Sequence, residues 1–161
     1  MSNMAWNGQY HLASRDISTA VKNKSGSSAD LNSVLTSALT DAGYHTSIIL
    51  LNPKEMGQLP LTHPSLDKIN TFLVRVDLPN TEPIYLDATD PKSDLNLLPP
   101  SLAVNRAKVF MSRGIAQWVD LSILSNNNAN CFMSGSLDSK GMLNANVSIT
   151  YTGTLAMIIK E

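Results

Sequence analysis

Residues 26–43 read GSSADLNSVLTSALTDAG, and this stretch decides the fold because it has the strongest helical pattern in the chain. Gly43 supplies a C-terminal stop, since glycine readily adopts the positive φ that ends many helices. The pattern predicts a central helix over residues 28–42, with Leu35 and Leu39 fully buried in the middle of its apolar face. That face is formed by Leu31, Val34, Leu35, Ala38, Leu39 and Ala42.

The start of this predicted helix carries the residues of greatest chemical interest. A helix N-terminus presents free N–H groups and the positive end of the helix dipole, so it favours an anion. Serine is also a preferred N-cap, and Asp30 in the first turn complements the dipole. Capping alone therefore explains Ser27 or Ser28, without any catalytic role.

The segments around the central helix predict an α+β fold. Residues 9–24 have the pattern of a first helix. Five strand-like runs follow the central helix, near residues 46–51, 69–78, 84–88, 107–111 and 117–123. This order favours an antiparallel sheet on which the central helix packs.

The last part of the chain predicts a separate β unit. Residues 125–130 form a polar, Asn-rich linker, and strand-like runs follow at 131–138, 143–151 and 156–159. Residues 138–141, with Gly141 where a positive φ is needed, favour a hairpin connection. We therefore expect one domain over residues 5–123 and a second β unit over residues 124–161, outside the main sheet.

Composition excludes several classes of function. The chain has 161 residues, 43% of them hydrophobic and 16% charged, which is typical of a globular protein. A net charge of −1 provides no basic field for nucleic acid, and no apolar run approaches the ~20 residues of a membrane span. Cys131 is the single cysteine, so we expect it to be a small buried hydrophobe. No His, Asp or Glu spacing is typical of a metal site, and we expect no metal and no cofactor.

Taken in order, these features resemble the transglutaminase-like superfamily, whose core is papain-like. The resemblance covers residues 5–122 and depends on GSSADLN at 26–32, LDATD at 86–90 and the element order between them. The likeness is greatest to a subgroup of large, usually exported bacterial proteins, in which this module precedes a C-terminal β domain. It implies that residues 124–161 begin that β domain, truncated in this chain, and that the protein is periplasmic or otherwise exported.

The resemblance also implies where a catalytic triad would lie. Active members use a Cys nucleophile, a His base and an orienting Asp. In this chain these positions are matched by Ser28, Thr71 (which follows Asn70) and Asp87. A serine hydroxyl needs a base within about 3 Å, and threonine accepts no proton at neutral pH. The resemblance therefore implies a degenerate triad and a pseudoenzyme.

Three functions remain open. The favoured one is a non-catalytic module that binds a peptide, glycan or protein partner, or supports neighbouring domains. The alternative is a hydrolase or acyltransferase that uses Ser28 with a base from elsewhere, for which His63 is the candidate. The third is a structural spacer. Asp87 fits either a remnant of a triad or a residue that fixes the turn at 87–91 through its own hydrogen bonds.

Overall fold

The fold is a mixed α+β arrangement, as predicted, seen in a computed structural model that describes residues 4–62, 66–110, 114–124 and 127–159. The chain forms two compact units, Met1–Ser125 and Asn126–Glu161, called unit 1 and unit 2. Among the described residues, no helix combines the length and the apolar character needed to cross a membrane.

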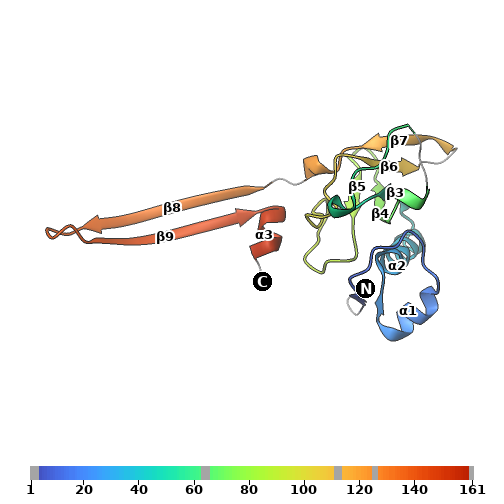
Figure 1. Cartoon of the computed structure of the whole chain (residues 1–161), viewed down its shortest axis with the longest axis horizontal. Helices are drawn as coiled ribbons and strands as arrows, with labels where there is room; N and C mark the ends of the chain where they lie inside the picture. Colours follow the sequence, from blue (N-terminus) through green and yellow to red (C-terminus); the bar gives the residue numbers. More distant parts are fainter. Residues whose placement is uncertain (1–3, 63–65, 111–113, 125–126, 160–161) are drawn as a thin grey trace. The chain divides into compact units, whose positions relative to one another are not determined.

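Unit 1 begins with short elements that lead to the central helix (Figure 1). Strand β1 (Ala5–Trp6) pairs in parallel with β2 (Ser25–Gly26), and helix α1 (Ile17–Asn23) lies between them in the chain. The central helix, α2, spans Ser28–Asp41. The main sheet then contains β3 (His45–Leu51), β4 (Thr71–Asp77), β5 (Ile84–Leu86), β6 (Ala107–Phe110) and β7 (Ala116–Val119). Short 3-10 helices in the connections span Lys54–Met56, Leu66–Lys68 and Ser122–Leu124.

A capping box fixes the start of α2. The Ser27 side chain accepts a hydrogen bond from the Asp30 N–H, and the Asp30 carboxylate accepts one from the Ser27 N–H at 2.8 Å. Gly26 is required because a Cβ there would lie 2.7 Å from the Asp30 Cβ. At the other end, Gly43 has a φ of 88°. The central helix predicted over 28–42 is therefore confirmed to within one residue.

The main sheet has the order β5-β4-β3-β6-β7, and every neighbouring pair is antiparallel. Helix α2 packs on one face, where Ala29 lies against Leu50 and Phe72. This packing places the first turn of α2 beside the start of β4. The prediction of a central helix on an antiparallel sheet is confirmed at this level.

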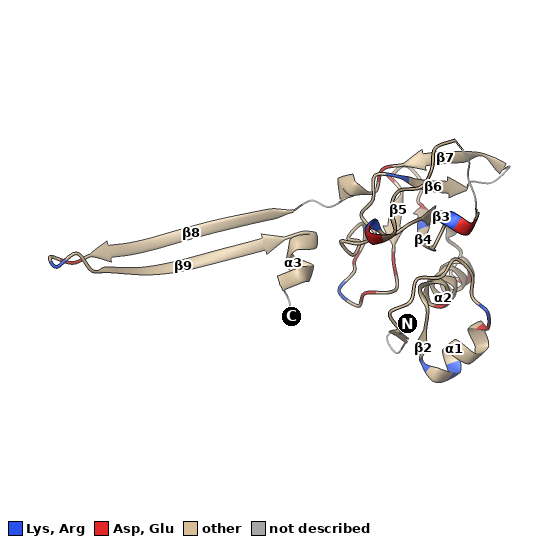
Figure 2. Cartoon of the chain, in the orientation of Figure 1, with Lys and Arg blue, Asp and Glu red and all other residues tan. Residues whose placement is uncertain are grey.

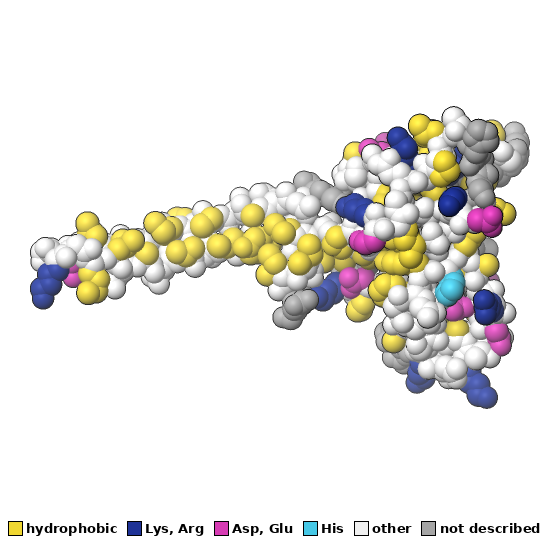
Figure 3. All heavy atoms as spheres, in the orientation of Figure 1, with side chains coloured by type: hydrophobic (Ala, Val, Ile, Leu, Met, Phe, Trp, Pro, Cys, Tyr) yellow, Lys and Arg dark blue, Asp and Glu magenta, His cyan; other side chains and the backbone are white. Residues whose placement is uncertain are grey.

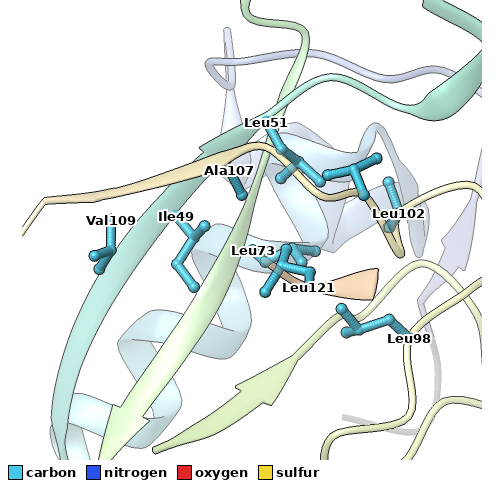
Figure 4. Packing of buried hydrophobic residues seen from close by; sticks show 9 residues of the cluster. Ile49, Leu51, Leu73, Leu98, Leu102, Ala107, Val109 and Leu121 are labelled. Atoms are coloured by element: carbon cyan, nitrogen blue, oxygen red, sulfur yellow. The ribbon is translucent and has the colours of Figure 1, made fainter. Parts of the chain in front are cut away.

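The opposite face of the sheet is covered by connecting segments instead of a helix. Figure 4 shows Leu98, Leu102 and Leu121, which come from these segments, packed against side chains of the strands. Strand β4 is consequently buried on both faces, from Thr71 to Val74. The full cluster consists of Ile49, Leu51, Leu73, Leu98, Leu102, Val104, Ala107, Val109 and Leu121.

The first helix is shorter than predicted. The prediction of a helix over 9–24 is wrong for residues 9–16, because α1 begins at Ile17 with Asp16 as its N-cap. The Asp16 carboxylate accepts a hydrogen bond from the Thr19 N–H at 3.1 Å. Upstream, the backbone groups of Gln9 and His11 bond to Ser28, and so these residues do not continue a helix.

The burial predicted for Leu35 and Leu39 is also wrong, because both side chains are only partly buried. The buried residues of α2 are Ser28, Ala29, Leu31 and Asn32, all within its first five positions. Helical spacing predicts correctly which side of a helix is apolar. It does not predict how much of the helix length is covered by the sheet.

Unit 2 contains a long antiparallel hairpin followed by a short helix (Figure 1). Strands β8 (Asn128–Leu137) and β9 (Leu143–Thr152) pair with each other over ten residue pairs. The predicted turn is confirmed, with Gly141 at a φ of 81°. The described strands of unit 2 form a sheet separate from the five-stranded one, as expected.

Three predictions for unit 2 are wrong. Residues 128–130, expected in a linker, pair with β9 as part of β8. Residues 156–159, expected as a strand, lie in helix α3 (Thr154–Ile159). Gly153 adopts a φ of 69°, which ends β9, and the Asn127 side chain accepts a hydrogen bond from the Leu155 N–H at 2.8 Å. Cys131 is exposed and not buried, because it lies in a two-stranded hairpin whose side chains are exposed over most of its length.

We expect the replacement of Leu73 in β4 to destabilise unit 1 more than the replacement of Leu35 in α2. Leu73→Ala removes a fully buried side chain and should lower the free energy of unfolding by about 2–5 kcal/mol. Leu35→Ala removes a partly exposed side chain, and its smaller buried area gives a loss of about 1 kcal/mol. Urea unfolding at constant m-value measures both. Equal losses would contradict the partial exposure of Leu35.

Candidate functional site

Ser28 is the first residue of α2 and is fully buried. Its hydroxyl oxygen accepts a hydrogen bond from the His11 N–H at 3.0 Å, and the hydroxyl lies 3.3 Å from the His11 carbonyl, to which it donates. The Ser28 N–H donates to the Gln9 carbonyl at 3.0 Å. The segment before α1 therefore covers the helix N-terminus and occupies the polar groups that a substrate or an anion would use.

Thr71, the first residue of β4, contacts Ser28 directly. Its hydroxyl donates to the Ser28 hydroxyl oxygen at 2.8 Å, and Thr71 is 1% exposed. Two hydroxyl groups in contact supply neither an acidic nucleophile nor a base at neutral pH. The pair can hold α2 against β4, but it cannot generate an alkoxide.

Asp87 follows β5 and contacts a different partner. One carboxylate oxygen accepts a hydrogen bond from the Asn32 side-chain amide at 3.0 Å. The other accepts from the Thr89 N–H at 3.0 Å and from the Thr89 hydroxyl. Burial raises the pKa of the Asp87 carboxyl above its ordinary value, and the hydrogen bonds from Thr89 and Asn32 only partly offset this. Asp87 thus fixes the turn that follows β5.

Asn32 links Asp87 to the backbone of β4, and sequence reasoning assigned it no role. It is fully buried one helical turn after Ser28, on the same side of α2. Its amide nitrogen donates to the Phe72 carbonyl at 2.7 Å as well as to Asp87, and its amide oxygen accepts from the Ala88 N–H at 2.9 Å. A polar residue four positions after Ser28, in a helix predicted to be buried, was the signal that could have identified it.

The three histidines give Ser28 no imidazole partner in the described part of the chain. His11 touches Ser28 through its backbone, while its exposed ring lies 3.3 Å from the Gln9 side chain. His45 begins β3, as expected, and is exposed. His63, the candidate replacement base, lies outside the described residues. Among those residues there is also no group of three or more His, Cys, Asp or Glu side chains that could hold a metal ion.

A groove of about 930 Å³ reaches this network from the side of Asp87. Its apolar wall includes Trp6 from β1 and Leu35 from the partly exposed half of α2. Three carboxylates (Asp87, Asp90 and Asp94) line it, and Lys and Arg are absent from its described lining. Ser28 and Thr71 do not line this groove. The remaining lining residues are Met4, Ala5, Leu86, Ala88, Thr89, Pro91, Ser93 and Leu95.

The groove is therefore suited to binding and not to acyl transfer at Ser28. Its volume is that of ordinary ligand sites, about 300–1,000 Å³, and the charged side chains in its described lining are all acidic. Asp90 and Asp94 each accept a hydrogen bond from a nearby backbone N–H, of Lys92 and Leu95 respectively. These local bonds orient the carboxylates while each keeps further acceptor positions.

No protein-family model, no curated protein and no solved structure matches this chain.

The raised pKa of Asp87 predicts a specific dependence of stability on pH. The pKa of Asp87 is higher in the folded state than in the unfolded state, where the carboxyl has its ordinary pKa of 3.8. The folded state therefore binds the proton more tightly. The resulting stabilisation is complete below pH 3.8 and is lost as the pH rises through the folded-state value. The free energy of unfolding of the natural chain, relative to Asp87→Asn, should therefore fall as the pH rises above about 4.

This difference is measured by chemical unfolding of both proteins across the pH range. Asp41→Asn, which changes an exposed carboxylate on the same helix as Asn32, controls for the loss of one charge. A difference that is constant or that grows with pH would show that burial does not dominate at Asp87.

Proposed function

We propose that unit 1 is a non-catalytic, transglutaminase-like module, in which the three triad positions have a structural role and the adjoining groove binds a peptide segment of a partner or of a neighbouring domain. The observation that carries the proposal is the 2.8 Å contact between the fully buried hydroxyls of Ser28 and Thr71. The papain-like arrangement is part of the proposal. It is supported by the position of Ser28 at the start of a helix that packs on an antiparallel sheet.

The contacts of Ser28 favour a structural role over nucleophilic attack. Its hydroxyl already has two donors and one acceptor around it, and attack on a substrate would require these bonds to break. A hydroxyl also needs a base to remove its proton, and Thr71 accepts no proton at neutral pH. The alternative of a hydrolase or acyltransferase gains no support from this arrangement.

The groove indicates the chemistry of the ligand. Apolar side chains such as Trp6 and Leu35 suit aliphatic or aromatic groups. Asp90 and Asp94 line the groove, and their carboxylates suit a Lys or Arg side chain of a ligand. A short peptide that places one basic residue between apolar ones presents both features.

The relation to the catalytic family can be tested by restoring the missing groups. In a Cys131→Ser background, Ser28→Cys places a lone thiol at the N-terminus of α2, and Thr71→His places an imidazole beside it. We expect the double replacement to react with iodoacetamide at lower pH than Ser28→Cys alone, because an adjacent imidazolium and the helix N-terminus both favour the thiolate. The pH midpoint of labelling should lie below about 8.5.

Ser28→Cys with Thr71→Asn is the matched control, since asparagine supplies a polar side chain without a base. Identical labelling profiles for the His and Asn variants would contradict the assignment of Thr71 to the base position. Hydrolytic activity in the natural chain that disappears in Ser28→Ala would overturn the proposal that unit 1 is non-catalytic.

Ligand binding can be followed through Trp6, because Trp118→Phe leaves it as the only tryptophan. We expect acetyl-Leu-Lys-Leu-amide to change Trp6 fluorescence and to bind more tightly than acetyl-Leu-Gln-Leu-amide. Combining Asp90→Asn with Asp94→Asn should reduce this preference, by up to roughly fivefold for each partly exposed ion pair. Leu35→Glu should abolish binding by placing a charge on the apolar wall.

Glu82→Gln is the control for charge, because it removes a carboxylate from an exposed turn that does not line the groove. Equal affinity for the Lys and Gln peptides would contradict the assigned ligand chemistry. If neither peptide altered Trp6 fluorescence, the groove would not be a peptide site.

A further inference from the structure

The two faces of the β8–β9 hairpin differ completely in chemistry. Residues paired across an antiparallel ladder project to the same side, and successive residues alternate between sides. One side carries only apolar residues and is called the apolar face. It consists of the pairs Ala129–Tyr151, Cys131–Ile149, Met133–Val147, Gly135–Ala145 and Leu137–Leu143. Apart from Phe132, the other side carries only Asn, Ser and Thr.

The apolar face is exposed to solvent along its length. Leu137 is 70% exposed, Met133 is 62% exposed and Val147 is 56% exposed. Figure 3 shows hydrophobic side chains following one another along the hairpin. A two-stranded hairpin is marginally stable in water unless its apolar face packs against another layer, so this face requires a cover.

The charge pattern indicates what kind of surface can provide that cover. Neither β8 nor β9 contains an Asp, Glu, Lys or Arg residue, and Figure 2 shows the charges of the hairpin confined to its turn. A partner with charged groups at the contact would leave them buried and unpaired, which is costly. A second copy of the same face brings no charge into the contact.

The relief of the apolar face is also self-complementary. Met133 and Val147 form the central pair of the face. A two-fold axis that lies between the two layers at the level of this pair, across the strands, places the Cys131–Ile149 pair of one copy over the Gly135–Ala145 pair of the other. The bulky Ile149 then meets a shallow part of the partner's face. Gly135 keeps that part shallow, because a Cβ there would lie 2.8 Å from the Asn144 carbonyl oxygen.

We propose that the apolar face of β8–β9 packs against the same face of a second copy of this chain, forming a two-layered β-sandwich. Face-to-face packing of sheets at about 10 Å, with interdigitated side chains, is the ordinary way to bury such a surface. The interface belongs to unit 2 and is independent of the groove proposed for unit 1.

The size of the face predicts a dimer that dissociates on dilution. Ten residue pairs at about 3.3 Å give a length of about 33 Å, and two strands give a width of roughly 10 Å. The flat projection is then about 330 Å² per copy, to which the side-chain relief adds. Two such faces bury an area at the low end of specific interfaces, below about 1,200 Å² in total.

The test uses the full chain and measures its mass by light scattering and the alkylation rate of Cys131 between roughly 1 and 100 µM. Cys131 is the only cysteine and lies on the apolar face, so its labelling reports whether the face is covered. We expect the mass to rise to that of a dimer, and labelling to slow, as the concentration increases. This measurement needs no variant and stays informative if a substituted hairpin fails to fold.

Val147→Lys and Asn146→Lys form a matched pair, because they add the same charge at adjacent positions on opposite faces of β9. Val147→Lys should weaken the dimer at least about tenfold and keep Cys131 labelling fast at every concentration. Asn146→Lys should behave as the natural chain.

Three results would overturn the proposal. A monomer with fast labelling at all concentrations would mean that the face stays uncovered. A monomer with slow labelling at all concentrations would mean that the chain covers its own face. Mass that grows beyond a dimer while Cys131 still reacts quickly would point to pairing through the strand edges.

Discussion

The side-chain amide of Asn32 is the interaction on which the arrangement of unit 1 depends. Strand β5 pairs with residues 74–76 of β4, and the Phe72 carbonyl lies beyond the last of these pairs. The Asn32 amide bonds to that carbonyl and to the turn after β5, through Asp87 and Ala88. One side chain of α2 thus continues the hydrogen bonding where a strand stops. Because buried backbone groups must be paired, this contact fixes both the position of α2 and the conformation of the turn.

The same network explains why Ser28, Thr71 and Asp87 suit the structural role proposed for them. Ser28 and Thr71 satisfy each other at the junction of α2 and β4, while Asp87 is held by Asn32 and Thr89. Each polar group is buried, and each has a partner, which is the condition under which burial of polar groups is tolerated. A catalytic site needs the opposite, a nucleophile and a base whose bonds are open to a substrate. Because each of these buried polar groups already has a hydrogen-bond partner, the arrangement favours a rigid structure over a reactive one.

The sequence predicted those features of the fold that depend on local rules. The capping residues and Gly43 located α2, alternating and apolar runs located the strands of the main sheet, and Gly141 located the hairpin turn. The predictions failed where a distant contact decides the structure. The His11 N–H, in the segment before Asp16, bonds to Ser28, and the Asn127 side chain, which precedes β8, accepts a hydrogen bond from the Leu155 N–H of α3. No pattern within a single segment contains these contacts.

The candidate site was predictable to a similar degree. The sequence singled out Ser28, Thr71 and Asp87, and the structure places Ser28 and Thr71 in contact. Asp87 bonds instead to Asn32, which also bonds to the Phe72 carbonyl next to Thr71. Asn32 itself was not predicted, because helical spacing identifies the apolar positions of a helix and assigns no contact to a polar residue among them. The groove was missed for a different reason. It exists because the sheet covers only the first part of α2, and the extent of that cover depends on the lengths of distant strands.

A comparison of β4 with the β8–β9 hairpin shows why the apolar face of the hairpin needs a covering layer. Strand β4 is buried on both sides from Thr71 to Val74, and unit 1 covers it with α2 on one side and with the segments around Leu98 and Leu121 on the other. Apart from Phe132, the hairpin alternates between apolar and polar residues, so it needs one layer and not two. The proposed second copy supplies this layer without bringing a charged side chain of β8 or β9 into the contact. The continuous apolar face of the hairpin, and not its placement relative to unit 1, is what makes that layer necessary.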